Sequence, residues 1–184
     1  MTRADQTQGI RPRRTLGRQL DKAARHAFPA GCTIVLMLLV ETPFGIADQA
    51  TLLPAVTIAC VYFWSLFRPA AMPPPVVFLI GLLLDLLAYL PLGVGVLTLL
   101  VIHGLAVRWR ALLVRQSFLA VWLVFVGFAT GAAALSWALA ALLSFRLLPP
   151  GPMLFQALLT AALYPALAVL FVRAHRTVAD PEQA

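Results

Sequence analysis

The sequence predicts an all-α polytopic membrane protein, a compact bundle of six transmembrane helices with a short helical hairpin at its centre. Its 184 residues are 61% hydrophobic and only 11% charged, and the mean hydropathy is +0.90. Soluble domains are about 45–50% apolar and about 25% charged, so this chain has too little polar surface to cover a water-soluble core. A bilayer is the solvent that suits such a composition.

Six apolar runs separated by turn residues give the predicted spans. The runs cover residues 28–46, 50–67, 74–90, 93–107, 117–145 and 152–173. Proline and glycine mark four of the five breaks, which is typical of loops, and the break after residue 107 carries Arg108, Arg110 and Arg115. We therefore expect one transmembrane domain over residues 28–173, a basic tail at 1–27 before it and a second tail at 174–184 after it.

The first of these tails carries seven basic residues, which are Arg3, Arg11, Arg13, Arg14, Arg18, Lys22 and Arg25. Three of them, Arg14, Arg18 and Lys22, recur every four residues. This spacing is typical of a short amphipathic helix that lies on anionic membrane lipids. The alternative is a tail that only fixes the orientation of the first span.

The number of spans depends on whether residues 74–107 form one long helix or a hairpin of two. We interpret Pro91-Leu92-Gly93 as a turn, because six spans then place every Lys and Arg except Arg146 on one side of the membrane. Five spans would divide the basic residues more evenly, against the excess of Lys and Arg that cytoplasmic loops carry. Six spans with both termini in the cytoplasm are therefore expected.

Two of the predicted spans have unusual lengths. The fourth, residues 93–107, would be only about 22 Å long as a helix, which is shorter than a hydrocarbon core of about 30 Å. The fifth, residues 117–145, would reach about 43 Å. We expect the fourth span to be sheltered by other helices or to lie where the bilayer is thin, and the fifth to tilt or bend.

Asp85 lies well inside a predicted span, where a carboxylate is costly unless it is paired or hydrated. Gly81 shares its helix face, and glycine lets another backbone approach closely. One interpretation of Asp85 is a partner contact or an ion site. The other is a buried carboxylate that accepts hydrogen bonds from backbone N–H groups freed at the Pro91–Gly93 break. His103 on the next span is a candidate partner for Asp85, with simple packing as the alternative.

Gly127 and Gly131 form a small-xxx-small step in the fifth span. Such a step lets two helices approach closely. It would serve either packing within the bundle or binding of a partner helix.

Several functional classes lack support in the sequence. It carries no G-x-S-x-G motif, no H-E-x-x-H motif and no phosphate-binding glycine loop. Cys32 and Cys60 lie in apolar runs without the spacing of a zinc site. We expect no enzymatic activity, no metal and no cofactor. The net charge of +7 gathers at the ends of apolar runs, so we expect no nucleic-acid partner.

Residues 60–110 carry a series of motifs. The aromatic run Tyr62-Phe63-Trp64 precedes Arg68-Pro69, the helix with Gly81-Leu82-Leu83-Leu84-Asp85 follows, and Pro91-Leu92-Gly93 opens the next span. In this order the motifs resemble the central segment of the rod-shape-determining MreD family. Outside residues 60–110 the likeness is one of hydropathy alone.

The resemblance implies a non-catalytic subunit of the bacterial cell-elongation complex in the inner membrane. It implies direct binding to an MreC-type single-span protein, and indirect links to the MreB-type filament and to the cell-wall synthase, in addition to contact with membrane lipids. The family's fold is thought to be similar to that of the substrate-binding subunits of energy-coupling-factor transporters. That similarity supplies the alternative function, a small-solute-binding membrane component, whose expected mark is a polar pocket that opens outward.

Overall fold

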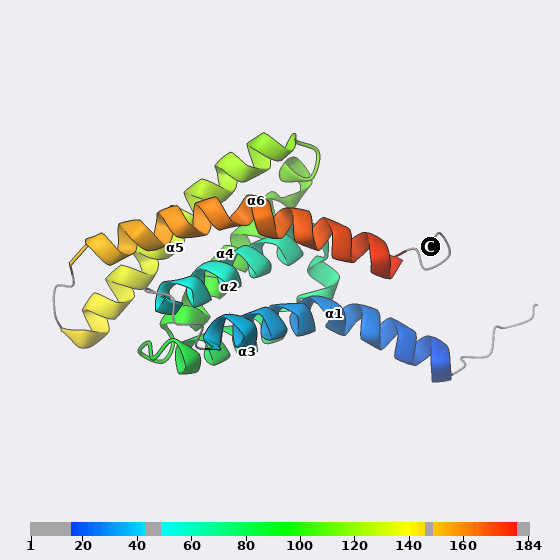
Figure 1. Cartoon of the computed structure of the whole chain (residues 1–184), viewed down its shortest axis with the longest axis horizontal. Helices are drawn as coiled ribbons and strands as arrows, with labels where there is room; N and C mark the ends of the chain where they lie inside the picture. Colours follow the sequence, from blue (N-terminus) through cyan, green and yellow to red (C-terminus); the bar gives the residue numbers. More distant parts are fainter. Residues whose placement is uncertain (1–15, 43–48, 146–148, 180–184) are drawn as a thin grey trace, which may run out of the picture.

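The computed structural model describes residues 16–42, 49–145 and 149–179, and every regular element in these ranges is a helix. In chain order the elements are α1 (Leu16–Glu41), α2 (Gln49–Phe67), the 3₁₀ helix η1 (Pro69–Ala71), α3 (Pro74–Leu87), α4 (Val94–Leu113), α5 (Phe118–Ser144) and α6 (Gly151–Ala179). Successive α-helices run in alternating directions, so the start of α1 and the end of α6 lie at the same end of the molecule (Figure 1). The predicted all-helical class is confirmed.

Among the described residues, three helices are long and apolar enough to cross a membrane, namely α4, α5 and the Gly151–Phe171 part of α6. The apolar parts of the other three are shorter, at Ala27–Glu41, Thr51–Phe67 and Pro74–Leu87. The length and composition of the three long helices indicate a membrane protein.

Helix α2 is the centre of the fold. Its residues 53–66 are all buried, as expected for a helix that is apolar on every side. In Figure 1 it lies between α1 and α6, and α4 also packs against it. The centre of the bundle is therefore a helix shielded by protein, even though its apolar stretch is short.

Aromatic rings of α2 hold its neighbours in place. Tyr62 packs against Phe125 of α5 and Tyr164 of α6, with ring centroids 4.9 and 5.7 Å apart. Trp64 meets Phe171 of α6 at 5.4 Å and Phe28 of α1 at 5.9 Å. Pairs of this kind contribute about 0.5–1.5 kcal/mol each beyond the area that they bury. The aromatic run of the sequence therefore joins four helices.

The central segment is a hairpin, as the sequence predicts. Helix α3 ends at Leu87, α4 begins at Val94, and the two pack side by side. Helix α3 ends in a Schellman-type turn, because Tyr89 adopts a left-handed conformation (φ 52°) and the N–H of Leu90 donates to the carbonyl of Asp85 at 3.1 Å. Residues 74–107 are therefore two helices.

Several helices differ in length from the predicted spans. Helix α4 has 20 residues, about 30 Å, because it continues through Arg108 and Arg110 to Leu113. The short helix is α3, with 14 residues. The expectation that the fourth helix is short is therefore corrected, because the short helix is the third. Helix α1 begins at Leu16 and runs through the second half of the predicted tail. Arg14, with which the predicted amphipathic helix begins, lies outside the described residues.

The two ends of the bundle differ in charge. One end, where α2 and α4 terminate and α3 and α5 begin, is called the basic end. It carries the arginines whose side chains the structure describes, which are Arg68, Arg108, Arg110, Arg115 and Arg173. The opposite end holds the α3–α4 turn and is called the hairpin end. Glu41 and Asp85 belong to the half of the molecule nearer the hairpin end.

Candidate functional site

The side chain of Asp85 connects the end of α3 to the start of α4. Its carboxylate is 1% exposed and accepts hydrogen bonds from the backbone N–H groups of Gly93 at 2.8 Å, Gly95 at 2.6 Å and Val96 at 3.4 Å. The first N–H groups of a helix have no partner within the helix, and the helix dipole favours an acidic group there. Asp85 therefore caps α4 from the neighbouring helix, which is the second of the two interpretations of the sequence.

Gly81 allows α3 to lie directly on the backbone of α4. A Cβ atom added to Gly81 would lie 2.6 Å from the Cα atom of Val96, and one added to Gly95 would lie 2.5 Å from Oδ1 of Asp85. A side chain at Gly81 would therefore push the two backbones apart, and one at Gly95 would displace the carboxylate of Asp85. The short distance between the two backbones is what brings the N–H groups of α4 within reach of Asp85.

The turn between these helices has its own requirements. Gly93 has φ +103°, a conformation that other residues rarely adopt, and it stands as the N-cap residue of α4. The carbonyl of Pro91 accepts a hydrogen bond from the N–H of Val94 at 3.2 Å. Both residues therefore shape the hairpin. Tyr89 and Leu92 project from its tip and are 91% and 64% exposed.

His103 binds a different partner from the predicted one. Its Nδ1 lies 2.8 Å from the hydroxyl oxygen of Ser65 on α2, in a buried position. His103 follows Gly95 by eight residues, or about 12 Å along the axis of α4. It therefore lies away from Asp85, toward the basic end of the bundle. Where side chains are described, Asp85 and His103 form no hydrogen bond or ion pair. The suggested pairing is corrected to a link between α2 and α4.

Arg68 and Pro69 lie where the chain leaves α2. The N–H of Arg68 donates to the carbonyl of Trp64 at 2.7 Å, and the carbonyl of Arg68 accepts from the N–H of Ala71 at 3.0 Å. Pro69 is the first residue of η1, a position that a residue without an N–H tolerates. The pair thus ends one helix and starts the short 3₁₀ turn that leads to α3.

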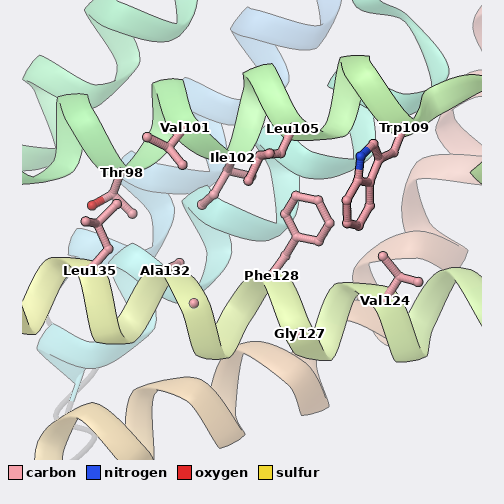
Figure 2. A pocket seen from close by; sticks show the side chains of 11 residues that line it. Thr98, Val101, Ile102, Leu105, Trp109, Val124, Gly127, Phe128, Ala132 and Leu135 are labelled. Atoms are coloured by element: carbon pink, nitrogen blue, oxygen red, sulfur yellow. The ribbon is translucent and has the colours of Figure 1, made fainter.

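An open apolar groove runs between α4 and α5, with a volume of about 460 Å³. Figure 2 shows side chains from both helices directed into it. Trp109 and Phe128, whose rings are perpendicular and 6.1 Å apart, lie toward one end of the groove, and Thr98 and Leu135 lie toward the other (Figure 2). Thr98 also bonds across to Ser136 of α5 at 3.1 Å, which joins the two helices beside the groove.

Gly127 and Gly131 line this groove. Both are exposed, and a Cβ atom added to either would meet no atom within 4 Å. The small-xxx-small step of α5 therefore packs against no helix in the described part of the chain. Of the two interpretations of this step, packing within the bundle therefore does not agree with the described part of the structure.

Two interactions at the site escaped prediction. Ser65 holds His103, and Arg110 donates from Nε to the carbonyl of Leu66 in the last turn of α2 at 2.8 Å. A lone serine within an aromatic span is a signal for a hydrogen bond between helices, so the first could have been suspected. The sequence shows Arg110 only as one positive charge among several.

The hairpin and the groove thus form one candidate site along α4. At the hairpin end of the molecule, the site is a contact between the backbones of α3 and α4, where the carboxylate of Asp85 already accepts three hydrogen bonds. Toward the basic end, the site is an open apolar surface with two glycines. No family model matches the chain, and searches of curated proteins and of solved structures gave no match either.

Proposed function

We propose that this chain is a non-catalytic, six-span subunit of the bacterial cell-elongation complex, oriented with both termini in the cytoplasm. It binds the transmembrane helix of an MreC-type single-span protein, and through that protein links the MreB-type filament to peptidoglycan synthesis. The motifs of residues 60–110 motivate this proposal. The observation that carries it is the α4–α5 groove with its two open glycines.

The groove has the properties of a helix-binding surface. Its lining extends over residues 98–109 of α4 and 124–135 of α5, about 17 Å along each helix. Small residues on a membrane helix let another helix approach closely enough for extended van der Waals contact. Since Gly127 and Gly131 have open space above them, a partner helix could lie directly on the backbone of α5.

The hairpin supports a scaffolding role more than a chemical one. The carboxylate of Asp85 already accepts hydrogen bonds from three backbone N–H groups, so its oxygens serve the fold. This geometry keeps α4 fixed against α3 and presents one wall of the groove. A rigid wall limits the ordering that binding would otherwise require.

The test is co-purification of the full chain with the MreC-type protein of the same organism. Gly127→Leu and Gly131→Leu each fill the groove, and we expect either to lower recovery of the partner about tenfold, since overpacking costs about 1–3 kcal/mol. Gly104→Leu is the matched control, because Gly104 is an exposed helical glycine with open space that does not line the groove. Equal recovery from all three variants would remove the groove from the proposal.

The alternative, a solute-binding component, predicts a polar pocket at the outer end. A hollow of about 190 Å³ lies there between the hairpin tip, α5 and α6, and its polar lining includes Ser136, Trp137 and Gln156. It is smaller than the about 300–1,000 Å³ of typical ligand pockets, and its described lining includes no acidic residue. Retention of a small molecule by the purified protein would favour this alternative over the scaffold.

A further inference from the structure

A second hollow, separate from the groove, opens at the basic end between α2, α5 and α6. Its volume is about 450 Å³. Its floor is formed by buried apolar and aromatic side chains, among them Phe63, Val121, Tyr164 and Ala168. Its walls include Phe67 and Phe118, which are exposed. An exposed apolar hollow of this kind must be covered by something apolar when the protein is in its natural solvent.

The hollow has the depth of one membrane leaflet. On α6 its lining runs from Tyr164 to Arg173, nine residues apart or about 14 Å along the helix. Half of a hydrocarbon core of about 30 Å is about 15 Å. A chain that entered beside Arg173 and reached Tyr164 would therefore extend from the membrane surface to the middle of the bilayer.

The rim of the hollow is polar and positive. Gln116 and Arg173 both line it and are exposed, and Arg115 is the next residue in the chain before Gln116. The acidic residues whose side chains the structure describes, Glu41 and Asp85, lie toward the hairpin end. Arg173 and Arg115 make this rim basic, and basic pockets between membrane helices attract anionic lipid headgroups.

We infer that this hollow holds one acyl chain of an anionic phospholipid, with the lipid phosphate beside Arg173 and Gln116. The apolar floor takes the chain, the rim takes the phosphate, and the depth matches one leaflet. This inference concerns a different surface from the proposed partner groove and does not depend on it.

The shape of the lining favours a lipid chain over a protein helix. None of the described residues that line this hollow is a glycine, whereas Gly127 and Gly131 leave the α4–α5 groove open to a second backbone. Large rings such as Phe63 and Tyr164 leave room for a narrow, flexible chain instead. A helix would need small residues to approach as closely.

The experiment measures lipid retained by the full chain, purified in detergent and stripped of lipid. Dioleoyl-phosphatidylglycerol or dioleoyl-phosphatidylcholine, which have the same chains, is added back, and native mass spectrometry counts the bound lipid. We expect the wild type to retain phosphatidylglycerol preferentially. Arg173→Glu should weaken that binding about fivefold or more, since one basic residue near an anionic lipid contributes about 1 kcal/mol. Arg108→Glu, an exposed charge reversal outside the lining, should leave it unchanged.

Gln116→Glu places a negative charge at the same rim without touching Arg173, and it should show the same loss. It serves as the second test if Arg173→Glu fails to fold, which thermal melting in lipid-free detergent will reveal. Equal binding of the two lipids, or equal losses in Arg173→Glu and Arg108→Glu, would overturn the inference. A dimer or a bound protein seen in place of lipid, and lost in Arg173→Glu, would overturn it as well.

Discussion

At the level of single residues, the carboxylate of Asp85 joins α3 to the start of α4. It is buried and caps the first turn of α4 from α3 through three N–H groups. We expect Asp85→Ala to lower the free energy of unfolding, because each buried donor left without an acceptor costs about 1–3 kcal/mol. Asp85→Asn, which keeps one carbonyl oxygen, should lose less. Thermal unfolding in detergent measures both changes.

The control for this prediction is Glu41→Ala, because Glu41 is the exposed acid at the end of α1. The prediction fails if Asp85→Ala and Glu41→Ala both have the melting temperature of the wild type. A stable Asp85→Ala variant that no longer recovers the proposed MreC-type partner would instead assign Asp85 to a partner contact.

Gly81 provides a second prediction at this scale. An added methyl group would lie 2.6 Å from the Cα atom of Val96, so Gly81→Ala must push α3 away from α4 and should destabilise the protein by about 1–3 kcal/mol. Gly104→Ala is the matched variant, since Gly104 has open space and alanine favours a helix by about 0.5–1 kcal/mol over glycine. Opposite shifts in melting temperature are expected. Shifts of the same sign and size would contradict the close contact.

Single residues also show what the sequence could and could not predict about the site. The break at Pro91–Gly93 leaves backbone N–H groups without helical partners near Asp85, so hydrogen bonds from these groups to Asp85 could be predicted from the sequence. The lone Ser65 in an aromatic span suggests a hydrogen bond between helices, but only the packing of α2 against α4 shows that its partner is His103. The spacing of Gly127 and Gly131 reveals that they share a face, but only the packing of α4 and α6 around α5 decides that the face stays open.

At the level of helices, Arg110 fastens the end of α2 to α4. Its Nε donates to the carbonyl of Leu66 at 2.8 Å, where the helix dipole favours a positive charge. Arg110→Met should destabilise the protein by about 1 kcal/mol through loss of this bond. Arg108→Met removes the same charge from the same end, and thermal unfolding of the two variants separates the bond from the charge. Equal stability of both variants would count against a role for the bond.

The same arginines explain why some helix ends were misjudged. Hydropathy located all six helices, because each contains an apolar run set off by proline, glycine or basic residues. It placed the end of the fourth run at residue 107, yet α4 continues to Leu113. Arginine is a good helix former and is favoured in the last turn of a helix, so loss of hydropathy does not mean loss of helix. The start of α1 at Leu16 reflects the helix propensity of arginine and lysine alone.

At the level of the whole molecule, the burial of α2 bears on the number of spans. Its apolar stretch is shorter than those of α4, α5 and α6, but residues 53–66 meet protein on all sides. A helix that is surrounded by other helices does not itself have to match the thickness of the lipid. Helix length alone therefore cannot decide between six crossings and the three given by the longest helices.

The position of Ala70 relative to Tyr89 decides between these two arrangements. Both residues are exposed and flank α3 at its opposite ends. In a variant with Cys32 and Cys60 replaced by alanine, six spans predict that Tyr89→Cys reacts with an impermeant maleimide on spheroplasts, whereas Ala70→Cys reacts only after lysis. Phe145→Cys and Gln116→Cys, at the two ends of α5, calibrate the outer and inner sides. If α4, α5 and α6 alone cross the membrane, Ala70→Cys must react together with Tyr89→Cys, because the α3 between them would stay on one side.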